Sequence, residues 1–569
     1  MFSQLFEIFS FLSKKLRFGW LTLLPLSIVV AGLESLGVIL IFHTVQYMKN
    51  PDQSSIPSWL SFLPAGSFFW MAAFFVTVFA AKNLFLALFL TFRNSLAANT
   101  QAFLCRRLLK NYLQADYQFH LQRNSSELIR NITESVEPVC NLGFNGLVTL
   151  SNYIFIACAI TSMLVILSPT TGLLILLLAG LLVSIIYLIS RAYLNKQSEK
   201  TEKAKKDRLQ TLTQLFGSFR ELIISGKQTF WIKRFMNHQN EYVHSNSHAL
   251  SATYAASLLM ETLLITALMI MAGLFLSASQ TQSELLFPVL GTYAYAAARL
   301  IPLASGISLH LGMVQYAQKP MTNVIDHLEL PPRLSGETKI NRSNKRQIKV
   351  SNLSFKYPAK QYAVLKNINF TVESGESVGI VGPSGSGKST LMLLLLGILN
   401  HEEGEIRVCD HKLQEVSKSW QALIGYVPQE IYLLDDSIRA NIAFGIAGKN
   451  INEKRLAEVV KQAHLDEVIN SLDQGLQTIV GEHGMQLSGG QRQRLAIARA
   501  LYNQPDFLFL DEATAALDVE TEEVITRTLQ ELHGKLTILI IAHRESTLKH
   551  CDRILSLENG CLIEQNRHV

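Results

Sequence analysis

The stretch that decides the fold of the C-terminal part is Gly382-Pro383-Ser384-Gly385-Ser386-Gly387-Lys388-Ser389. The apolar segment 376–381 before it predicts a buried strand, and residues 389–399 after it predict a helix. A strand, a glycine-rich loop and a helix in this order form the context that a phosphate-binding loop requires. Small residues let backbone N–H groups turn towards the phosphates, and the helix N-terminus adds partial positive charge. Lys388 supplies a full charge for the β and γ phosphates, and Ser389 supplies a hydroxyl for Mg²⁺.

Two short stretches downstream carry related chemistry. Leu487-Ser488-Gly489-Gly490-Gln491 opens a predicted helix that continues to Leu501, and Ser488 is placed to cap its N-terminus. The two glycines expose backbone N–H groups there, which predicts a second anion site without a lysine. Phe507–Leu510 predicts a buried strand that ends in Asp511-Glu512. Asp511 is suited to hold Mg²⁺, and Glu512 is suited to orient and polarise an attacking water.

These three elements, in this order, resemble the nucleotide-binding domain of ABC transporters. The resemblance implies that Glu512 is the catalytic carboxylate, that His543 contacts the γ phosphate and that Tyr357 stacks on adenine. It further implies that Gln429 senses Mg²⁺ and that Asp518 lies in the loop that crosses the dimer interface. Glu482 resembles the exporter contact to the membrane part.

The residues implied for ATP and Mg²⁺ form three sets. The catalytic set is Glu512, His543 and Lys388. The metal set is Ser389, Gln429 and Asp511. The ATP-binding set is Tyr357, Gly382, Pro383, Ser384, Gly385, Ser386, Gly387, Lys388, Ser389, Thr390, Gln429, Ser488, Gly489, Gly490, Gln491 and Asp518.

The lysine-free anion site implies a partner subunit. Within one domain, the helix tip at Ser488 would have no phosphate to bind. The ABC family pairs two domains head to tail, with two ATP molecules held between them, so the resemblance implies an obligate dimer. Every catalytic position matches the family pattern, which favours a homodimer over a heterodimer with one altered site.

Composition separates an apolar part from a soluble part. The chain has 569 residues, of which 49% are hydrophobic and 17% charged, which is apolar for a soluble protein. Residues 1–330 hold 24 of the 51 basic residues but only 16 of the 45 acidic ones. This excess positive charge fits cytoplasmic loops and anionic lipid, and we expect no nucleic-acid partner. The six cysteines show no metal-binding spacing, and we expect them to be reduced.

Six apolar runs are long enough to cross a bilayer as helices. They are Phe18–Tyr47, Ser67–Phe92, Val139–Leu167, Thr170–Ile189, Thr253–Ser277 and Leu285–Ile307. Lys14, Lys15 and Arg17 precede the first run, so we expect cytoplasmic N- and C-termini. The sequence thus predicts an α-helical membrane domain of six transmembrane helices at 1–329, a linker at 330–345 and an α/β P-loop ABC ATPase domain at 346–569.

The basic segments between runs two and three and between runs four and five have helical periodicity. We therefore expect the membrane helices to continue into the cytoplasm and turn back near Asp116–Arg123 and Ser218–Ser225. By resemblance to ABC exporters, these turns are coupling helices that dock on the ATPase. The alternative is an unrelated solvated helical hairpin.

Three ionisable residues lie inside the apolar runs, where they usually face a protein interior or a wet cavity. They are Glu34, Lys82 and Arg299. One interpretation is a structural ion pair of Glu34 with Lys82 or Arg299. The other is a basic lining that contacts an anionic substrate headgroup. Glu261, in the fifth run, could change the net charge of that lining.

Six runs ahead of one ATPase resemble the exporter class. The loop at 50–64, the surroundings of Glu34 and the stretch Arg299-Leu300-Ile301-Pro302 together resemble bacterial lipid-linked oligosaccharide flippases. The resemblance implies ATP-driven movement of a lipid-linked or amphipathic substrate from the cytoplasmic side of the bacterial inner membrane, with membrane lipids as partners. The alternatives are a multidrug or peptide exporter and, in another class, an ATP-gated receptor or channel without transport.

Overall fold

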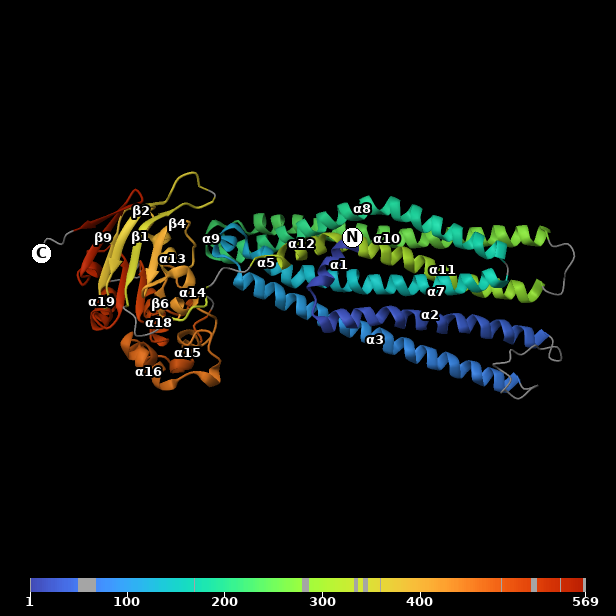
Figure 1. Cartoon of the computed structure of the whole chain (residues 1–569), viewed down its shortest axis with the longest axis horizontal. Coiled ribbons are helices and arrows are strands. Elements are labelled where there is room, and N and C mark those ends of the chain that lie inside the picture. Colours follow the sequence, from blue (N-terminus) through green and yellow to red (C-terminus); the bar gives the residue numbers. More distant parts are fainter. Residues whose placement is uncertain are drawn as a thin grey trace. The chain divides into compact units, whose positions relative to one another are not determined.

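The computed structural model divides the chain into two compact units (Figure 1). It describes residues 2–49, 68–167, 169–278, 286–331, 336–340, 346–358, 360–481, 484–512, 519–542 and 544–565. The first unit contains Met1–Ala115 and Phe119–Pro332, and the second contains Asp116–Gln118 and Arg333–Val569. The boundary between the two units, after Pro332, lies within residues 330–345. That this stretch is a linker stays a prediction.

The first unit is helical, and long helices coincide with the predicted apolar runs. They are α2 (Lys14–Lys49), α3 (Phe68–Gln114), α7 (Asn145–Leu167), α8 (Pro169–Gly217), α10 (Gln228–Ala278) and α11 (Leu286–Tyr316). Hydroxyl groups in these apolar helices bond back to the carbonyl one turn earlier, as Ser27 does to Leu23 and Thr100 to Leu96, both at 2.8 Å. This local bonding gives each hydroxyl proton an acceptor within its own helix.

Within the described part of the chain, four helices are long and apolar enough to cross a bilayer, or five if one bent pair counts as a span. The bent pair is Leu300–Tyr316 with Gln318–Leu328, at 41°. The fourth predicted run lies in α8, but its side chains at 171–176 are outside the described residues. The number of six spans therefore stays a prediction.

Short elements connect the long helices at the predicted turns. They are α1 (Phe2–Phe11), α4 (Tyr117–Gln122), α5 (Ser125–Arg130), η3 (Asn131–Ser135), α6 (Val136–Pro138), η4 (Val139–Phe144), α9 (Phe219–Ser225) and α12 (Gln318–Leu328). The helices α4 and α9 occupy the two stretches where the sequence predicts that the chain turns back. Gly226, at φ 63°, ends α9 in the left-handed conformation that glycine adopts most readily.

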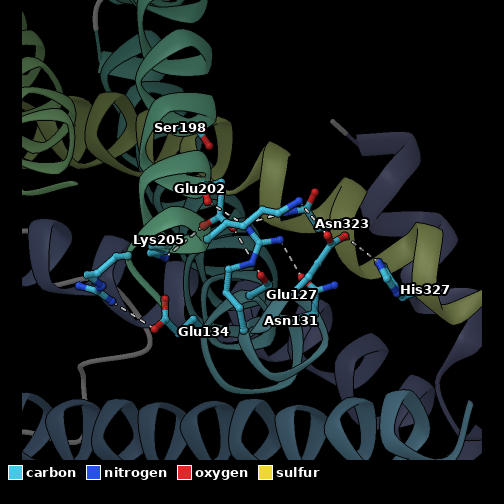
Figure 2. A network of polar contacts seen from close by, with 12 residues as sticks. Glu127, Asn131, Glu134, Ser198, Glu202, Lys205, Asn323 and His327 are labelled. Atoms are coloured by element: carbon cyan, nitrogen blue, oxygen red, sulfur yellow. Dashed lines mark hydrogen bonds and ion pairs between the residues drawn. The ribbon is translucent and has the colours of Figure 1, made fainter. Parts of the chain in front are cut away.

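A buried polar network joins α5 and η3 to α8 and α12 (Figure 2). Arg130 donates to the backbone oxygen of Glu202 at 2.8 Å and pairs with its carboxylate at 3.6 Å, and both side chains are about 5% exposed. Lys205 and Asn323 also reach the Glu202 carboxylate, at 3.1 and 3.4 Å. At one edge of the network, Lys206 pairs with Glu127 at 2.8 Å. The network holds elements that are far apart in sequence.

The second unit contains two sheets. A four-stranded sheet has the order β2 (Leu365–Val372), β1 (Ile348–Phe355), β4 (Glu403–Val408) and β5 (His411–Lys412). A six-stranded sheet has the order β10 (Cys561–Gln565), β9 (Arg553–Glu558), β3 (Ser377–Val381), β8 (Thr537–Ile541), β7 (Phe507–Asp511) and β6 (Ile424–Val427). All neighbours in the six-stranded sheet are parallel except β10 with β9.

Helices cover both faces of the parallel sheet, which explains why its central strands are buried and apolar except at their ends. The described helices of this unit are α13 (Lys388–Leu395), α14 (Leu413–Gln421), α15 (Ile438–Ile442), α16 (Glu453–Gln462), α17 (Asp466–Asn470), α18 (Gly489–Tyr502), α19 (Val519–Leu532) and α20 (Glu545–Leu548). On one face, Trp420 packs at 4.5 Å from the Phe507 ring, and on the other Leu508 joins the core of α18 and α19. All six cysteines are free, as expected.

Candidate nucleotide-binding and catalytic site

The parallel strands bring three predicted site segments to one edge of the sheet. The loop 382–387 follows β3, Glu512 follows β7 and Gln429 follows β6. Because carboxyl ends of parallel strands meet at the same edge, their following residues converge there. Gln429 indeed donates its side-chain amide to the Glu512 carboxylate at 2.6 Å, across 83 residues of sequence.

The glycine-rich loop has a backbone that only glycine adopts easily at its key positions. Gly382 has φ 148°, and a Cβ there would lie 2.2 Å from the backbone oxygen of Leu557. Gly387 has φ 107° and stands directly before α13. Residues 383–385 are exposed, whereas 386–388 are buried. The loop therefore presents a solvent-accessible rim around a buried turn, into which N–H groups and the helix N-terminus can direct positive charge.

Lys388 lies back across this loop. Its ammonium donates to the backbone oxygens of Gly382 at 2.9 Å and Pro383 at 3.0 Å. Burial lowers the pKa of Lys388 below its usual value, while the charges of Glu512 and Asp511 oppose that change. One cation thus faces two carboxylates, so phosphate could bind here only together with a further cation.

Asp511 and Glu512 differ in environment although they are adjacent. Burial raises the pKa of Asp511, the nearby Glu512 raises it further, and Lys388 and a hydrogen bond from Ser389 lower it. Glu512 is half-buried and has φ 48°, a left-handed conformation that is unusual for a residue other than glycine. Such backbone strain is often found where a side chain must be aimed at a reacting group.

The residues predicted to hold Mg²⁺ fit such an ion. Asp511 Oδ1 is buried and accepts no hydrogen bond from the described residues, so a ligand position is available. The Ser389 side chain bonds to the same carboxyl group. A carboxylate and a hydroxyl beside a phosphate loop are the oxygen ligands that Mg²⁺ prefers.

Tyr357 and Thr390 lie beside the same loop. The Tyr357 hydroxyl is 3.3 Å from Thr390 Oγ1 in the first turn of α13, and its ring contacts Phe355 edge to face at 4.9 Å. The tyrosine ring is therefore next to the phosphate loop, where a base could stack on it.

The helix tip at Ser488 has the predicted geometry. Ser488 Oγ accepts from the Gln491 N–H at 3.2 Å, and Gln491 Oε1 accepts from the Ser488 N–H at 2.9 Å. This reciprocal capping box fixes the start of α18. Ser488 and Gly489 are exposed, whereas Gly490 is buried, and a Cβ on Gly490 would lie 2.3 Å from Thr521 Cγ2. The tip faces outward with free N–H groups.

Several predicted residues have no described geometry. His543, Asp518 and Glu482 lie outside the described residues, and Arg299 lies in α11 but its side chain is not described. In the membrane part, Lys82 pairs with Glu34 at 3.0 Å, and the two side chains are 7% and 15% exposed. This is one of the two ion pairs that the sequence left open.

The polar network around Arg130 and Glu202 was not predicted. The sequence contains its signal, because Glu127, Arg130 and Glu134 recur at spacings that share one helix face.

Comparison with known proteins matches both units. Residues 365–515 match the family model described as ABC transporter, and residues 21–298 match the ABC transporter transmembrane region. An ATP-dependent lipid A-core flippase of Pectobacterium atrosepticum is 30% identical over 471 residues, which is 82% of this chain and 79% of the relative. The protein with the same description in Saccharophagus degradans is 32% identical over 464 residues, covering 81% and 78% of the two chains.

A solved structure has the same fold over almost the whole length. It is a bacterial Atm1-family ABC exporter with ATP bound, with a TM-score of 0.81 and 22% sequence identity, covering 98% of this chain and 96% of that one.

Proposed function

Because this chain belongs to the ABC transporters, as an exporter half-transporter whose ATPase drives transport, we propose that it flips an amphipathic lipid with an anionic headgroup, of the lipid-linked oligosaccharide class. The cargo would move from the cytoplasmic side across a bacterial inner membrane, with both termini in the cytoplasm. ATP hydrolysis in this family is coupled to transport, so an ATP-gated channel is set aside.

The extent of the flippase similarity carries this proposal. The matched segments of 471 and 464 residues are far longer than the ATPase match at 365–515, so they include much of the helical unit. That unit is the part of a transporter that contacts cargo. Relatives named as lipid A-core flippases therefore favour a lipid cargo over a drug or peptide.

The Lys82–Glu34 pair supports an anionic headgroup more weakly. An ion pair inside an apolar run is costly and often lies on a substrate path. Lys82 Nζ also lies 4.7 Å from the centre of the Phe79 ring, so an aromatic face accompanies the cation. Arg299 would add a second positive charge at a similar depth, which would leave the group basic when Glu34 is counted.

The ATPase residues have roles that follow from their positions. Lys388 would neutralise the β and γ phosphates, Glu512 would hold and polarise the attacking water, and Gln429 would keep Glu512 aimed through their hydrogen bond. Asp511 and Ser389 would hold Mg²⁺, which supplies charge stabilisation to the transferring phosphoryl group when bound. His543 would contact the γ phosphate.

ABC half-transporters dimerise, and we propose a homodimer here. The order β3, β8, β7, β6 puts three strand spacings, about 14 Å, between the strand before the phosphate loop and β6, on which α18 packs. The Ser488 tip, with Gly489, Gly490, Gln491 and the loop at Asp518, would therefore serve the nucleotide of the partner.

The cargo proposal is tested by neutralising the buried pair as a whole. Removing Lys82 alone would leave Glu34 charged in an apolar environment and would destabilise the fold. The double change Lys82→Gln with Glu34→Gln removes both charges of this pair. We expect flipping of a lipid-linked oligosaccharide in proteoliposomes to fall at least tenfold, while basal ATPase activity and thermal stability stay near wild type.

The matched control is Lys82→Arg, which keeps the cation and its pairing with Glu34 and should keep measurable flipping. Undiminished flipping in the double variant would exclude a headgroup role for Lys82. ATPase stimulation by hydrophobic drugs, without stimulation by the lipid, would favour the multidrug alternative.

A further inference from the structure

A basic hollow lies on the cytoplasmic extension of α3, apart from the nucleotide site and from Lys82. It has a volume of about 520 Å³ and is lined by Phe103, Arg106, Arg107, Lys110, Asn111, Gln114, Leu328 and Leu330. The cations come from consecutive turns of one helix face, and the apolar residues come from α3 and from the end of α12. The lining contains no acidic residue.

The cations of this hollow are not neutralised by neighbouring carboxylates. Arg106 and Lys110 are exposed, and within the described part of the chain neither makes an ion pair or side-chain hydrogen bond. Arg107 is half-buried and donates to the backbone oxygen of Phe11 at 2.7 Å. The carbonyls that end α12 do not serve the cations, because the Asn111 amide bonds to His327 and Leu328, at 3.3 and 3.0 Å. Like charges kept together without a counter-charge indicate an anionic ligand.

Contacts between helices place the hollow at the level where the chain enters its first apolar run. Arg107 of α3 donates to the backbone oxygen of Phe11 at 2.7 Å, and Phe11 lies three residues before Lys14, which precedes that run. Basic residues at the start of a membrane span lie at the level of the lipid headgroups.

The neighbouring helix α1 supports the same level. Leu5, Ile8 and Leu12 point into the protein, whereas Phe6 is 74% exposed on the opposite side. A short helix with one buried face and an exposed aromatic residue is typical of a segment that lies in the membrane interface. The guanidinium of Arg107 lies 4.9 Å from the ring centre of Phe11, the last residue of α1.

We propose that this hollow binds the phosphate of an anionic phospholipid in the cytoplasmic leaflet. Arg106, Arg107 and Lys110 contact the phosphate, and Phe103, Leu328 and Leu330 contact the glycerol and the first carbons of the chains. Basic pockets between membrane helices on the cytoplasmic side suit such headgroups. The site concerns a bound lipid and does not depend on which cargo the transporter moves.

The experiment uses the full-length protein in detergent, titrated with phosphatidylglycerol or phosphatidylcholine and followed by native mass spectrometry. We expect Arg106→Gln with Lys110→Gln to weaken binding of the first phosphatidylglycerol about tenfold or more, because two of the three cations that contact the phosphate are lost. Binding of phosphatidylcholine should not change.

The matched control is Lys14→Gln with Lys15→Gln, which removes the same charge from exposed juxtamembrane residues that do not line the hollow. It should bind phosphatidylglycerol as wild type does, and the charge-preserving pair Arg106→Lys with Lys110→Arg should retain binding. If the control and the hollow variant lose phosphatidylglycerol binding equally, the loss comes from general surface charge, and the proposal is overturned. Displacement of the lipid by millimolar inorganic phosphate would also overturn it, because the site would then serve free phosphate.

Discussion

Burial of Asp511 works against its ionisation, although the proposed role of this residue requires a carboxylate. Its side chain is 6% exposed, and Oδ1 has no hydrogen-bond donor among the described residues. The raised pKa follows from this burial and from the charge of Glu512. Without a bound cation, the ionised form therefore costs folding free energy, which is a common feature of sites built for a ligand.

The change Asp511→Asn should stabilise the nucleotide-free protein at neutral pH while abolishing ATPase activity. Since the folded-state pKa is above the unfolded value, the folded state binds more protons between the two, and stability falls as pH rises through that window. Asparagine cannot ionise, so it avoids this loss of stability. We therefore expect the free energy of unfolding to rise by about 1 kcal/mol at pH 7.5, and this gain to shrink as the pH is lowered.

Thermal melting in detergent with a chelator, at several pH values, measures this difference. A variant that is less stable than wild type at pH 7.5 would contradict the account. With Mg²⁺ and ATP present, the wild type should be more stable than the variant, because only the wild type gains the binding free energy of the ion.

At single residues, a helix cap could be predicted from the sequence, but an unusual backbone conformation could not. The cap at Ser488 was predictable because serine followed three residues later by glutamine has a known local geometry. The left-handed φ of Glu512 was not, because nothing in its residue type favours that region; the surrounding β7 and β8 impose it, with the Glu512 N–H held by Ile541 at 2.9 Å.

At the scale of elements, the polar network of Figure 2 predicts how much stability is lost when one of its charged residues is replaced. Arg130 and Glu202 are both about 5% exposed, so removing Arg130 leaves the buried Glu202 carboxylate with Lys205 in place of two cations. We expect Arg130→Met to destabilise the protein by about 2–3 kcal/mol, the cost of lost hydrogen bonds to a charged group. Adding Glu202→Gln to Arg130→Met should restore much of that loss.

The matched control is the pair Arg123 and Glu127, in which Arg123 is 41% exposed. Arg123→Gln should cost less than about 1 kcal/mol, as exposed pairs do. Thermal unfolding in detergent measures all four proteins. Equal losses at Arg123 and Arg130 would show that burial does not govern this network.

Helix positions were predictable from the apolar runs, but the π-helical turns were not. Apolar length alone predicts helices near α2, α3, α7, α8, α10 and α11, since a bilayer segment must satisfy its own backbone. The turns η3 and η4 lie on either side of Pro138, which has no N–H for the carbonyl one turn earlier. How a helix absorbs that loss depends on its neighbours, which a single sequence does not specify.

At the scale of the whole molecule, the sequence predicts the proposed dimer because one chain carries two separate phosphate-binding features. One chain carries a phosphate loop with Lys388 and an outward helix tip at Ser488, and the sheet order separates them. A symmetric pair arranged head to tail would give each nucleotide one lysine and one tip. The two incomplete sites of one chain therefore imply a partner subunit.

Mixing two inactive variants tests this composite site. Lys388→Ala removes the lysine from the phosphate loop, and Ser488→Arg blocks the helix tip, so each homodimer has two damaged sites. In a mixed dimer both changes fall on the same site and the other site is intact. Half of randomly mixed dimers are mixed, so a one-to-one mixture should recover about a quarter of wild-type ATPase activity if sites act independently. A monomeric enzyme would show only the sum of the two variants at every ratio. Recovery should also vanish when each variant is first reconstituted separately, because the subunits then cannot exchange.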